Sequence, residues 1–133
     1  MQLSAGVDII EIERIQQALE RHARRFLRRV YTAGERSKYG DRVPELAVRF
    51  AGKEAVSKVL GTGFAGIAWR EIEILNDSRG KPVVSLSGRA QARAIELGIQ
   101  HIEISLSHSR EYAVAFAIGY RDEAGGMKAT SDS

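Results

Sequence analysis

The residues best suited to chemistry in this chain of 133 residues are carboxylates and cations in unusual places. Asp8 ends an apolar segment directly after Gly6-Val7, where a charge is costly unless it is paired or bound to a metal. Glu54 lies four residues before Lys58 within a predicted helix. Two separated carboxylates suit Mg²⁺, which takes one or two protein carboxylates and completes its coordination with water and phosphate. Asp8 and Glu54 are therefore candidate metal ligands.

Structural roles are open to the same residues. Asp8 can cap the helix predicted just after it, and Glu54 followed by Lys58 is the favoured helical ion pair, which usually marks a solvated face. Gly52, in the middle of that helix, costs about 1 kcal/mol relative to alanine and indicates close packing against another element. His108, between two serines in a predicted turn, is the histidine best placed for function, although turn histidines often have none.

Basic side chains are concentrated in one segment. Residues 14–42 hold nine basic and three acidic side chains, a local net charge of +6, whereas the whole chain has a net charge of +3. Such a segment favours an anionic partner, with a solvated helix face as the alternative. A nucleic acid is a weak candidate, because the segment has only three aromatic residues and no recognisable nucleic-acid motif.

Composition excludes several classes of protein. The chain is 44% hydrophobic and 28% charged and has no cysteine, which is typical of a globular domain without disulfides or cysteine-bound zinc. The longest apolar run, residues 113–118, is far shorter than the roughly 20 residues of a membrane span. Asp8, Glu11 and Glu13 do not suit a signal peptide, so we expect a cytoplasmic protein with no membrane partner. No P-loop and no cysteine nucleophile is present.

The hydrophobic pattern predicts a single α+β domain over residues 1–120, with a mainly antiparallel sheet packed with helices, and a polar, frayed tail over 121–133. A strand approaches another element closely at Gly6, and an amphipathic helix or a broken pair of helices follows. Thr32 and Glu35 form a capping box, and Ser87 is a plausible N-cap. The predicted strands cover 3–10, 69–75, 83–86, 102–106 and 112–119, and the predicted helices cover 12–30, 32–38, 45–60 and 89–97.

Four segments in this order resemble the bacterial holo-[acyl-carrier-protein] synthases, the small trimeric group of 4′-phosphopantetheinyl transferases. The segments are residues 6–15, which include Gly6-Val7-Asp8, then 31–35, then 49–58 running into Gly61-Thr62-Gly63, and last 105–113, and the turn Gly80-Lys81-Pro82 is in the same style. The resemblance implies a Mg²⁺-dependent enzyme of fatty acid biosynthesis. It would transfer phosphopantetheine from coenzyme A to a serine of an apo acyl carrier protein and release 3′,5′-ADP.

The resemblance also implies roles for particular residues. Asp8 and Glu54 would hold magnesium, Lys58 would be the cation nearest the reacting phosphate, and Glu54 would take the serine proton directly or through a metal-bound water. These three residues would be the catalytic set. The implied contacts with coenzyme A, in addition to Lys58, are Arg49, Lys81 and His108. The implied docking residues for the acidic carrier are Arg14, Arg21 and Arg25, or Arg24 in place of Arg25.

The resemblance further implies a homotrimer with its sites at subunit interfaces and no nucleic-acid partner. Two positions depart from the family pattern. Gly52 stands where the family has a small residue with a methyl group, and one extra residue lies between Arg14 and Phe26, which shifts the register of Arg24 and Arg25. A Mg²⁺-dependent hydrolase of phosphorylated nucleotides, using the same residues, is the alternative enzyme, and a basic nucleic-acid-binding module is the non-enzymatic alternative.

Overall fold

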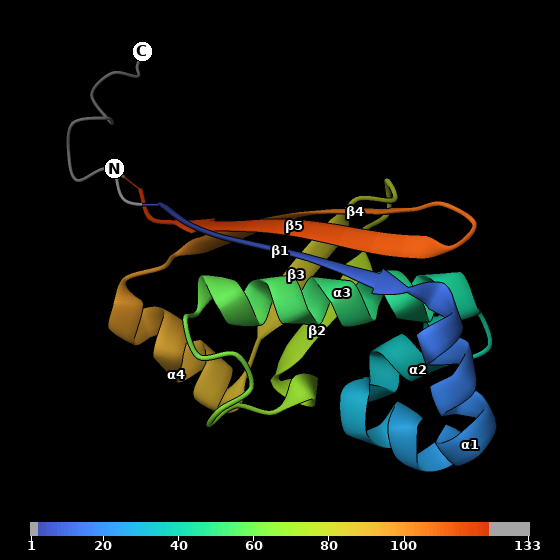
Figure 1. Cartoon of the computed structure of the whole chain (residues 1–133). Coiled ribbons are helices and arrows are strands. Elements are labelled where there is room, and N and C mark those ends of the chain that lie inside the picture. The colour runs from blue at the N-terminus through green and yellow to red at the C-terminus, as the bar shows by residue number, and fades with distance from the viewer. Residues whose placement is uncertain (1–2, 123–133) are drawn as a thin grey trace.

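The computed structural model describes residues 3–122, which form two small antiparallel sheets around a central helix (Figure 1). In chain order the elements are β1 (Leu3–Glu11), α1 (Ile12–Val30), α2 (Ala33–Tyr39), α3 (Val43–Val59), the 3₁₀ turn η1 (Trp69–Glu71), β2 (Ile72–Asn76), β3 (Pro82–Leu86), α4 (Gly88–Leu97), β4 (His101–His108) and β5 (Tyr112–Tyr120). The predicted α+β class and the predicted order of helices and strands are confirmed.

The larger sheet has the strand order β1-β5-β4, and α3 lies along its inner face (Figure 1). Small residues on that face allow the helix to approach closely. A Cβ at Gly6 would collide with the carbonyl oxygen of Ala55, and one at Gly119 would lie 2.6 Å from Cγ1 of Val59. The close approach predicted at Gly6 is therefore confirmed, and its partner is α3.

The hairpin of β2 and β3 packs on another side of α3, where Gly52 makes the contact possible. A Cβ at Gly52 would lie 2.7 Å from Cδ1 of Ile74 and 3.2 Å from Cδ1 of Ile104. Gly52 therefore has the close packing that its position in the helix predicted. Figure 1 shows α1 and α2 near one end of α3 and α4 near the other, so that α3 is the central element of the fold.

Helix α1 is broken at His22, whose backbone angles (φ −144°, ψ 44°) are not helical. Ile15 and Val30 are buried, one on each side of the break, and the arginines of α1 are exposed. The sequence pattern had left open whether one helix or two would form here, and the structure has two helical segments in direct succession. The break lies between Arg14 and Phe26, where the resemblance places one extra residue.

One local prediction is wrong. Residues 69–71 form a 3₁₀ turn instead of the start of a strand, because the Glu71 side chain accepts a hydrogen bond from the backbone N–H of Ala68. Ser87 is the N-cap residue of α4 as predicted, but its side chain makes no capping bond, and the carboxylate of Glu71 accepts the N–H of Arg89 at 3.1 Å instead. The predicted tail begins at Arg121, and most of it lies outside the described residues. Within residues 3–122, no helix is long and apolar enough to cross a membrane.

The outer face of the larger sheet is exposed and apolar. Leu3, Val7 and Ile9 of β1 are 63%, 54% and 62% exposed, and Phe116 of β5, which pairs with Val7, is 44% exposed. The opposite face of β5 carries Ala113, Ala115 and Ala117, which are fully buried. The sheet therefore covers α3 with one face and presents large apolar side chains on the other.

Candidate active site

Asp8, Glu54 and Lys58 come together where β1 crosses the C-terminal half of α3. Nζ of Lys58 donates to the carbonyl oxygen of Val7 at 2.8 Å and lies 3.3 Å from Oδ1 of Asp8. Gly6 makes this contact possible, because a Cβ there would lie 2.9 Å from Cβ of Lys58. The strand thus reaches the helix closely enough for a carboxylate of β1 to meet an ammonium of α3.

The structural roles of these residues differ in part from those that the sequence allowed. Asp8 lies within β1 and cannot cap α1, whose N-cap is Glu11. Lys58 forms its ion pair with Asp8 on a different element, so the ammonium does not serve the helical pair that the spacing from Glu54 favoured. Both side chains remain in contact with solvent, since those of Lys58 and Asp8 are 51% and 19% exposed.

The electrostatics of this group favour a bound cation. Partial burial raises the pKa of Glu54, the nearby charge of Asp8 raises it further, and Lys58 opposes both effects. Asp8 and Glu54 therefore repel each other at a partly buried site, and the charge of Lys58 offsets part of this repulsion. Two carboxylates suit Mg²⁺, with water and phosphate as the remaining ligands. The residues present fit a magnesium ion.

Arg49 and His108 lie at a different place. They line a cavity of about 260 Å³ together with Gly80 and Pro82, the two neighbours of Lys81. Arg49 and Lys58 are nine residues apart on α3, which at about 100° per residue places them on opposite sides of the helix. Two of the residues assigned to coenzyme A phosphates, Arg49 and His108, thus line one cavity, and Lys81 lies next to two residues that line it.

Arg49 is already engaged inside the chain. It is 1% exposed, its Nε donates to the carbonyl oxygen of Ile74 at 2.9 Å, and its two terminal nitrogens donate to Glu45 and to Asn76. The ring of Tyr39 lies 3.6 Å from its Cζ. Arg49 therefore has a structural role that the sequence analysis missed, and its contact with coenzyme A stays a prediction. Lys81, by contrast, is exposed, and its ammonium lies 3.1 Å from a carboxylate oxygen of Glu103.

A second missed feature is the buried ion pair between Lys53 and Glu35, both fully buried, with 2.8 Å between Nζ and Oε1. Nζ of Lys53 also donates to the carbonyl oxygens of Trp69 and Ile72, and the other oxygen of Glu35 accepts the N–H of Ile74 at 2.7 Å. Burial lowers the pKa of Lys53, and the charge of Glu35 opposes this shift. Together with Arg49, these side chains satisfy the open edge of β2 in place of a third strand.

The arginines assigned to carrier docking are all exposed on α1. Arg14 and Arg21 precede the break at His22 and, seven residues apart, lie on the same face of the first segment. Arg25 follows the break, so its direction relative to Arg14 is decided by the break and not by helical spacing. The structure thus presents a basic surface, and the set that would meet a carrier stays a prediction.

Residues 4–117 match the family model described as the 4′-phosphopantetheinyl transferase superfamily. A holo-[acyl-carrier-protein] synthase of Herpetosiphon aurantiacus is 52% identical over 124 residues, which cover 88% of this chain and 98% of the relative. One of Dehalococcoides mccartyi is 51% identical over 116 residues, covering 87% and 97%. The chain therefore belongs to the holo-[acyl-carrier-protein] synthase family within this superfamily.

Solved structures agree with this assignment. The Helicobacter pylori holo-[acyl-carrier-protein] synthase in complex with coenzyme A has a TM-score of 0.80 at 29% identity, covering 87% of this chain and 99% of that one. The Bacillus anthracis enzyme in complex with coenzyme A (3′,5′-ADP) has a TM-score of 0.74 at 34% identity, covering 90% and 96%. The resemblance found in the four sequence segments is confirmed.

Proposed function

We propose that this chain transfers 4′-phosphopantetheine from coenzyme A to a serine of an apo acyl carrier protein and releases 3′,5′-ADP, as a step that supports fatty acid biosynthesis. The observation that carries the proposal is the convergence of Asp8, Glu54 and Lys58 from two elements that lie far apart in the sequence. Membership of the synthase family supports the same reaction.

Asp8 and Glu54 would hold one Mg²⁺ ion, which supplies charge stabilisation to the pyrophosphate of coenzyme A. Phosphoryl transfer asks a protein mainly to position the reactants and to stabilise charge, so no protein nucleophile is required. Lys58 supplies the second positive charge, and about half of its side chain is open to an incoming phosphate.

Glu54 would take the proton of the carrier serine hydroxyl, directly or through a metal-bound water, as the serine oxygen attacks the phosphorus. The new bond joins that oxygen to phosphorus, and the bond from phosphorus to the oxygen of 3′,5′-ADP breaks. Lys58 meets the charge that develops on the phosphate oxygens.

Coenzyme A would bind between subunits of a trimer. Lys58 and Asp8 meet on one side of α3, whereas Arg49 and His108 line a cavity on the other side, which favours a ligand shared between two chains. A neighbouring subunit that supplies the second group would complete the site. The exposed apolar face with Leu3, Val7, Ile9 and Phe116 supports an assembly of this kind, because large exposed apolar patches usually mark protein interfaces.

The acidic carrier would dock on α1 through Arg14, Arg21 and Arg25. All three are exposed, and the segment 14–42 has a net charge of +6, so electrostatic attraction would steer an acidic partner towards it. Docking there also brings the carrier near the end of β1 that carries Asp8, since α1 follows β1 directly.

The test is mass spectrometry of an apo acyl carrier protein incubated with the enzyme, coenzyme A and Mg²⁺. The carrier should gain the mass of one phosphopantetheine, and Asp8→Ala or Glu54→Ala should each nearly abolish the gain while the far-UV circular dichroism is unchanged. Their effects should be strongly non-additive, because both serve one ion. If either variant kept more than about a tenth of the activity at saturating Mg²⁺, the metal assignment would be wrong, since a metal supplies several kcal/mol.

A second assay separates this function from a nucleotide hydrolase. With coenzyme A and Mg²⁺ but no carrier, 3′,5′-ADP should appear very slowly, because water lacks the binding energy that positions the carrier serine. Rapid release without a carrier would support the hydrolase instead.

A further inference from the structure

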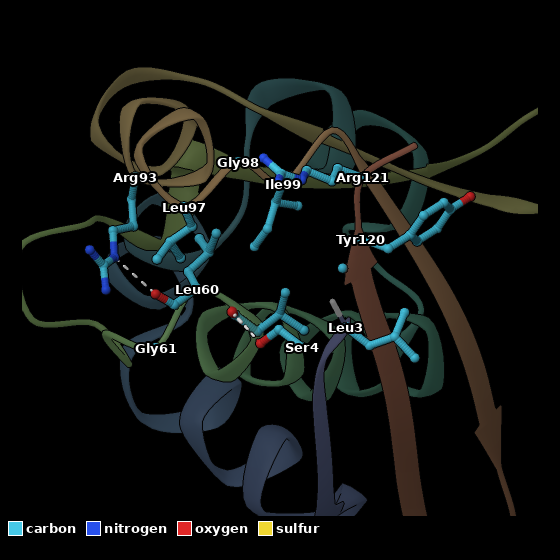
Figure 2. Close-up of a pocket in the computed structure, with 12 residues that line it drawn as sticks. Leu3, Ser4, Leu60, Gly61, Arg93, Leu97, Gly98, Ile99, Tyr120 and Arg121 are labelled. Carbon is cyan, nitrogen blue, oxygen red and sulfur yellow. Dashed lines mark hydrogen bonds between the residues drawn. The ribbon is translucent and has the colours of Figure 1, made fainter. Parts of the chain in front are cut away.

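A second cavity, of about 250 Å³, lies at the far end of the contact between β1 and α3 (Figure 2). Ser4 of β1 and Val59 of α3 form one wall, and the hydroxyl of Ser4 donates to the carbonyl oxygen of Val59 at 2.8 Å. Asp8 is four residues further along β1, roughly 13 Å away at the rise of a strand. None of the residues assigned above to catalysis, coenzyme A or the carrier lines this cavity.

The interior of the cavity is mainly apolar. Leu97 and Ile99 line the space between the end of α4 and the larger sheet, with the fully buried Leu60 behind them, and Figure 2 shows Leu97 and Ile99 between the side chains of Arg93 and Arg121. Leu97 is 42% exposed although it is a large aliphatic residue beside a hollow. An apolar ligand would therefore bury surface that the described part of the chain leaves open.

Two arginines lie at the rim, each beside a glycine. Nη2 of Arg93 lies 3.7 Å from the position that a Cβ would take at Gly61, and Nη1 of Arg121 lies 3.2 Å from the corresponding position at Gly98. Both glycines have positive φ values, +75° and +76°, which other residues rarely adopt, so these positions stay without side chains. The guanidinium groups thus lie beside backbone without side chains at two edges of the cavity.

The guanidinium of Arg93 is held in place from within the chain. Nε donates to the carbonyl oxygen of Leu60 at 3.0 Å, and Nη1 lies 3.0 Å from Oε1 of Glu96. The side chain of Arg93 is 32% exposed, whereas that of Glu96 is 69% exposed. A fixed, partly buried guanidinium loses little conformational entropy when it binds an anion, and it binds carboxylates through paired N–H donors.

We propose that this cavity binds an aliphatic carboxylate of medium length, with its chain against Leu97 and Ile99 and its carboxylate at the rim that carries Arg93 and Arg121. A cavity of about 150 Å³ holds benzene, so the 250 Å³ here suits a ligand of about ten heavy atoms, the size of octanoate. The proposal does not depend on the transferase function, because the cavity shares no residue with the proposed active site.

Calorimetry on the full chain, without coenzyme A or carrier, tests this proposal with octanoate as the probe. Octanoate should bind at one site per chain and about tenfold more tightly than octanol, which has the chain without the charge. Butyrate should bind at least about tenfold more weakly than octanoate, since each buried methylene contributes about 0.8 kcal/mol. In ¹H–¹⁵N spectra, the amide signals of Gly61, Gly98 and Gly119 should shift with octanoate.

Two variants test the arginines separately. Arg93→Gln and Arg121→Gln should each weaken octanoate binding several-fold and leave octanol binding unchanged, whereas the exposed control Arg79→Gln should change neither. Arg121→Gln keeps the test valid if Arg93→Gln unfolds, because Arg121 is exposed. Equal binding of octanol and octanoate, unchanged affinity in both variants, or no saturable binding of octanoate would each overturn the proposal. Glycine signals that shift only with protein concentration would also overturn it and would assign the cavity to a second copy of the chain.

Discussion

Replacing Lys53 by methionine should destabilise the fold strongly without touching the reacting groups. Lys53 and Glu35 are both fully buried, and Nζ of Lys53 bonds to Glu35, Trp69 and Ile72. Methionine fills a similar volume but leaves the Glu35 carboxylate buried without its cation and leaves two backbone carbonyl oxygens without their donor. Breaking a buried ion pair in this way costs about 3–5 kcal/mol.

The expected shift in melting temperature follows from the length of the chain. At about 2.1 cal/mol/K per residue, the unfolding entropy of 133 residues is about 0.28 kcal/mol/K, so each kcal/mol shifts Tm by about 3.5 °C. Lys53→Met should therefore lower Tm by roughly 10–18 °C. The measurement is calorimetry at a fixed chain concentration, because association would make Tm concentration-dependent.

Lys58→Met is the matched control, since it makes the same chemical change five residues further along α3. Its side chain is 51% exposed and its ammonium pairs with Asp8, so its loss should cost less than about 1 kcal/mol, or less than about 4 °C in Tm. Activity should show the opposite order. Lys58→Met should lower kcat at least about a hundredfold, whereas Lys53→Met should keep most of its activity well below its own Tm. Equal Tm losses in the two variants, or a loss below about 1 kcal/mol for Lys53→Met, would refute this reasoning.

Three further variants probe the metal site, the carrier surface and the assembly. Because the pKa of Glu54 is raised, its contribution to stability is present at low pH and is lost as pH rises through that pKa. Glu54→Gln should therefore have a Tm no lower than that of the wild type at pH 7 without metal, and Mg²⁺ should not raise the Tm of this variant. A rise in its Tm with Mg²⁺ would contradict the assignment of Glu54 as a metal ligand. The double variant Arg14→Glu/Arg21→Glu should raise the KM for the carrier, and the rise should be smaller at about 0.3 M salt. The KM for coenzyme A should stay unchanged. A rise in the KM for coenzyme A alone would place α1 in the nucleotide site. Phe116→Glu should have the mass of a single chain in light scattering. The control Val83→Glu, on β3 and equally exposed at 44%, should keep the mass of the wild-type assembly. An unchanged mass in Phe116→Glu would exclude this face as the interface.

The order of the elements and most of their ends could be predicted from the sequence, because these features depend on neighbours a few residues apart. The capping box of Thr32 and Glu35 is present, α4 ends at Gly98 in the left-handed conformation, and Pro44 lies in the first turn of α3. Gly6 and Gly52 indicated close packing, since each has a cost in free energy that only a nearby element would offset. The four family segments indicated the candidate site residues, because a resemblance to a family can be read from short runs of sequence.

The roles of the charged side chains on α3 could not be predicted in this way. Helical spacing favoured Glu54 as the partner of Lys58, but Asp8 of β1 takes that place, 50 residues away in the sequence. Arg49 was assigned to coenzyme A by resemblance, and only the position of β2 reveals that its nitrogens are engaged by Ile74, Asn76 and Glu45. The run of apolar residues 113–118 could have indicated a strand that is apolar on both faces, but not what covers its outer face.

The helices and strands follow from the sequence alone, because backbone conformation and amphipathic patterning are local properties, and the candidate residues follow from short segments that resemble a family. Which charges are buried, which meet and which stay in solvent depends on the packed fold. The electrostatic energy of a side chain depends on its distance from charges on other elements and on how much water those elements exclude. Lys53 and Lys58 are the same residue type on one helix, yet the first is buried against β2 and the second faces β1 and solvent.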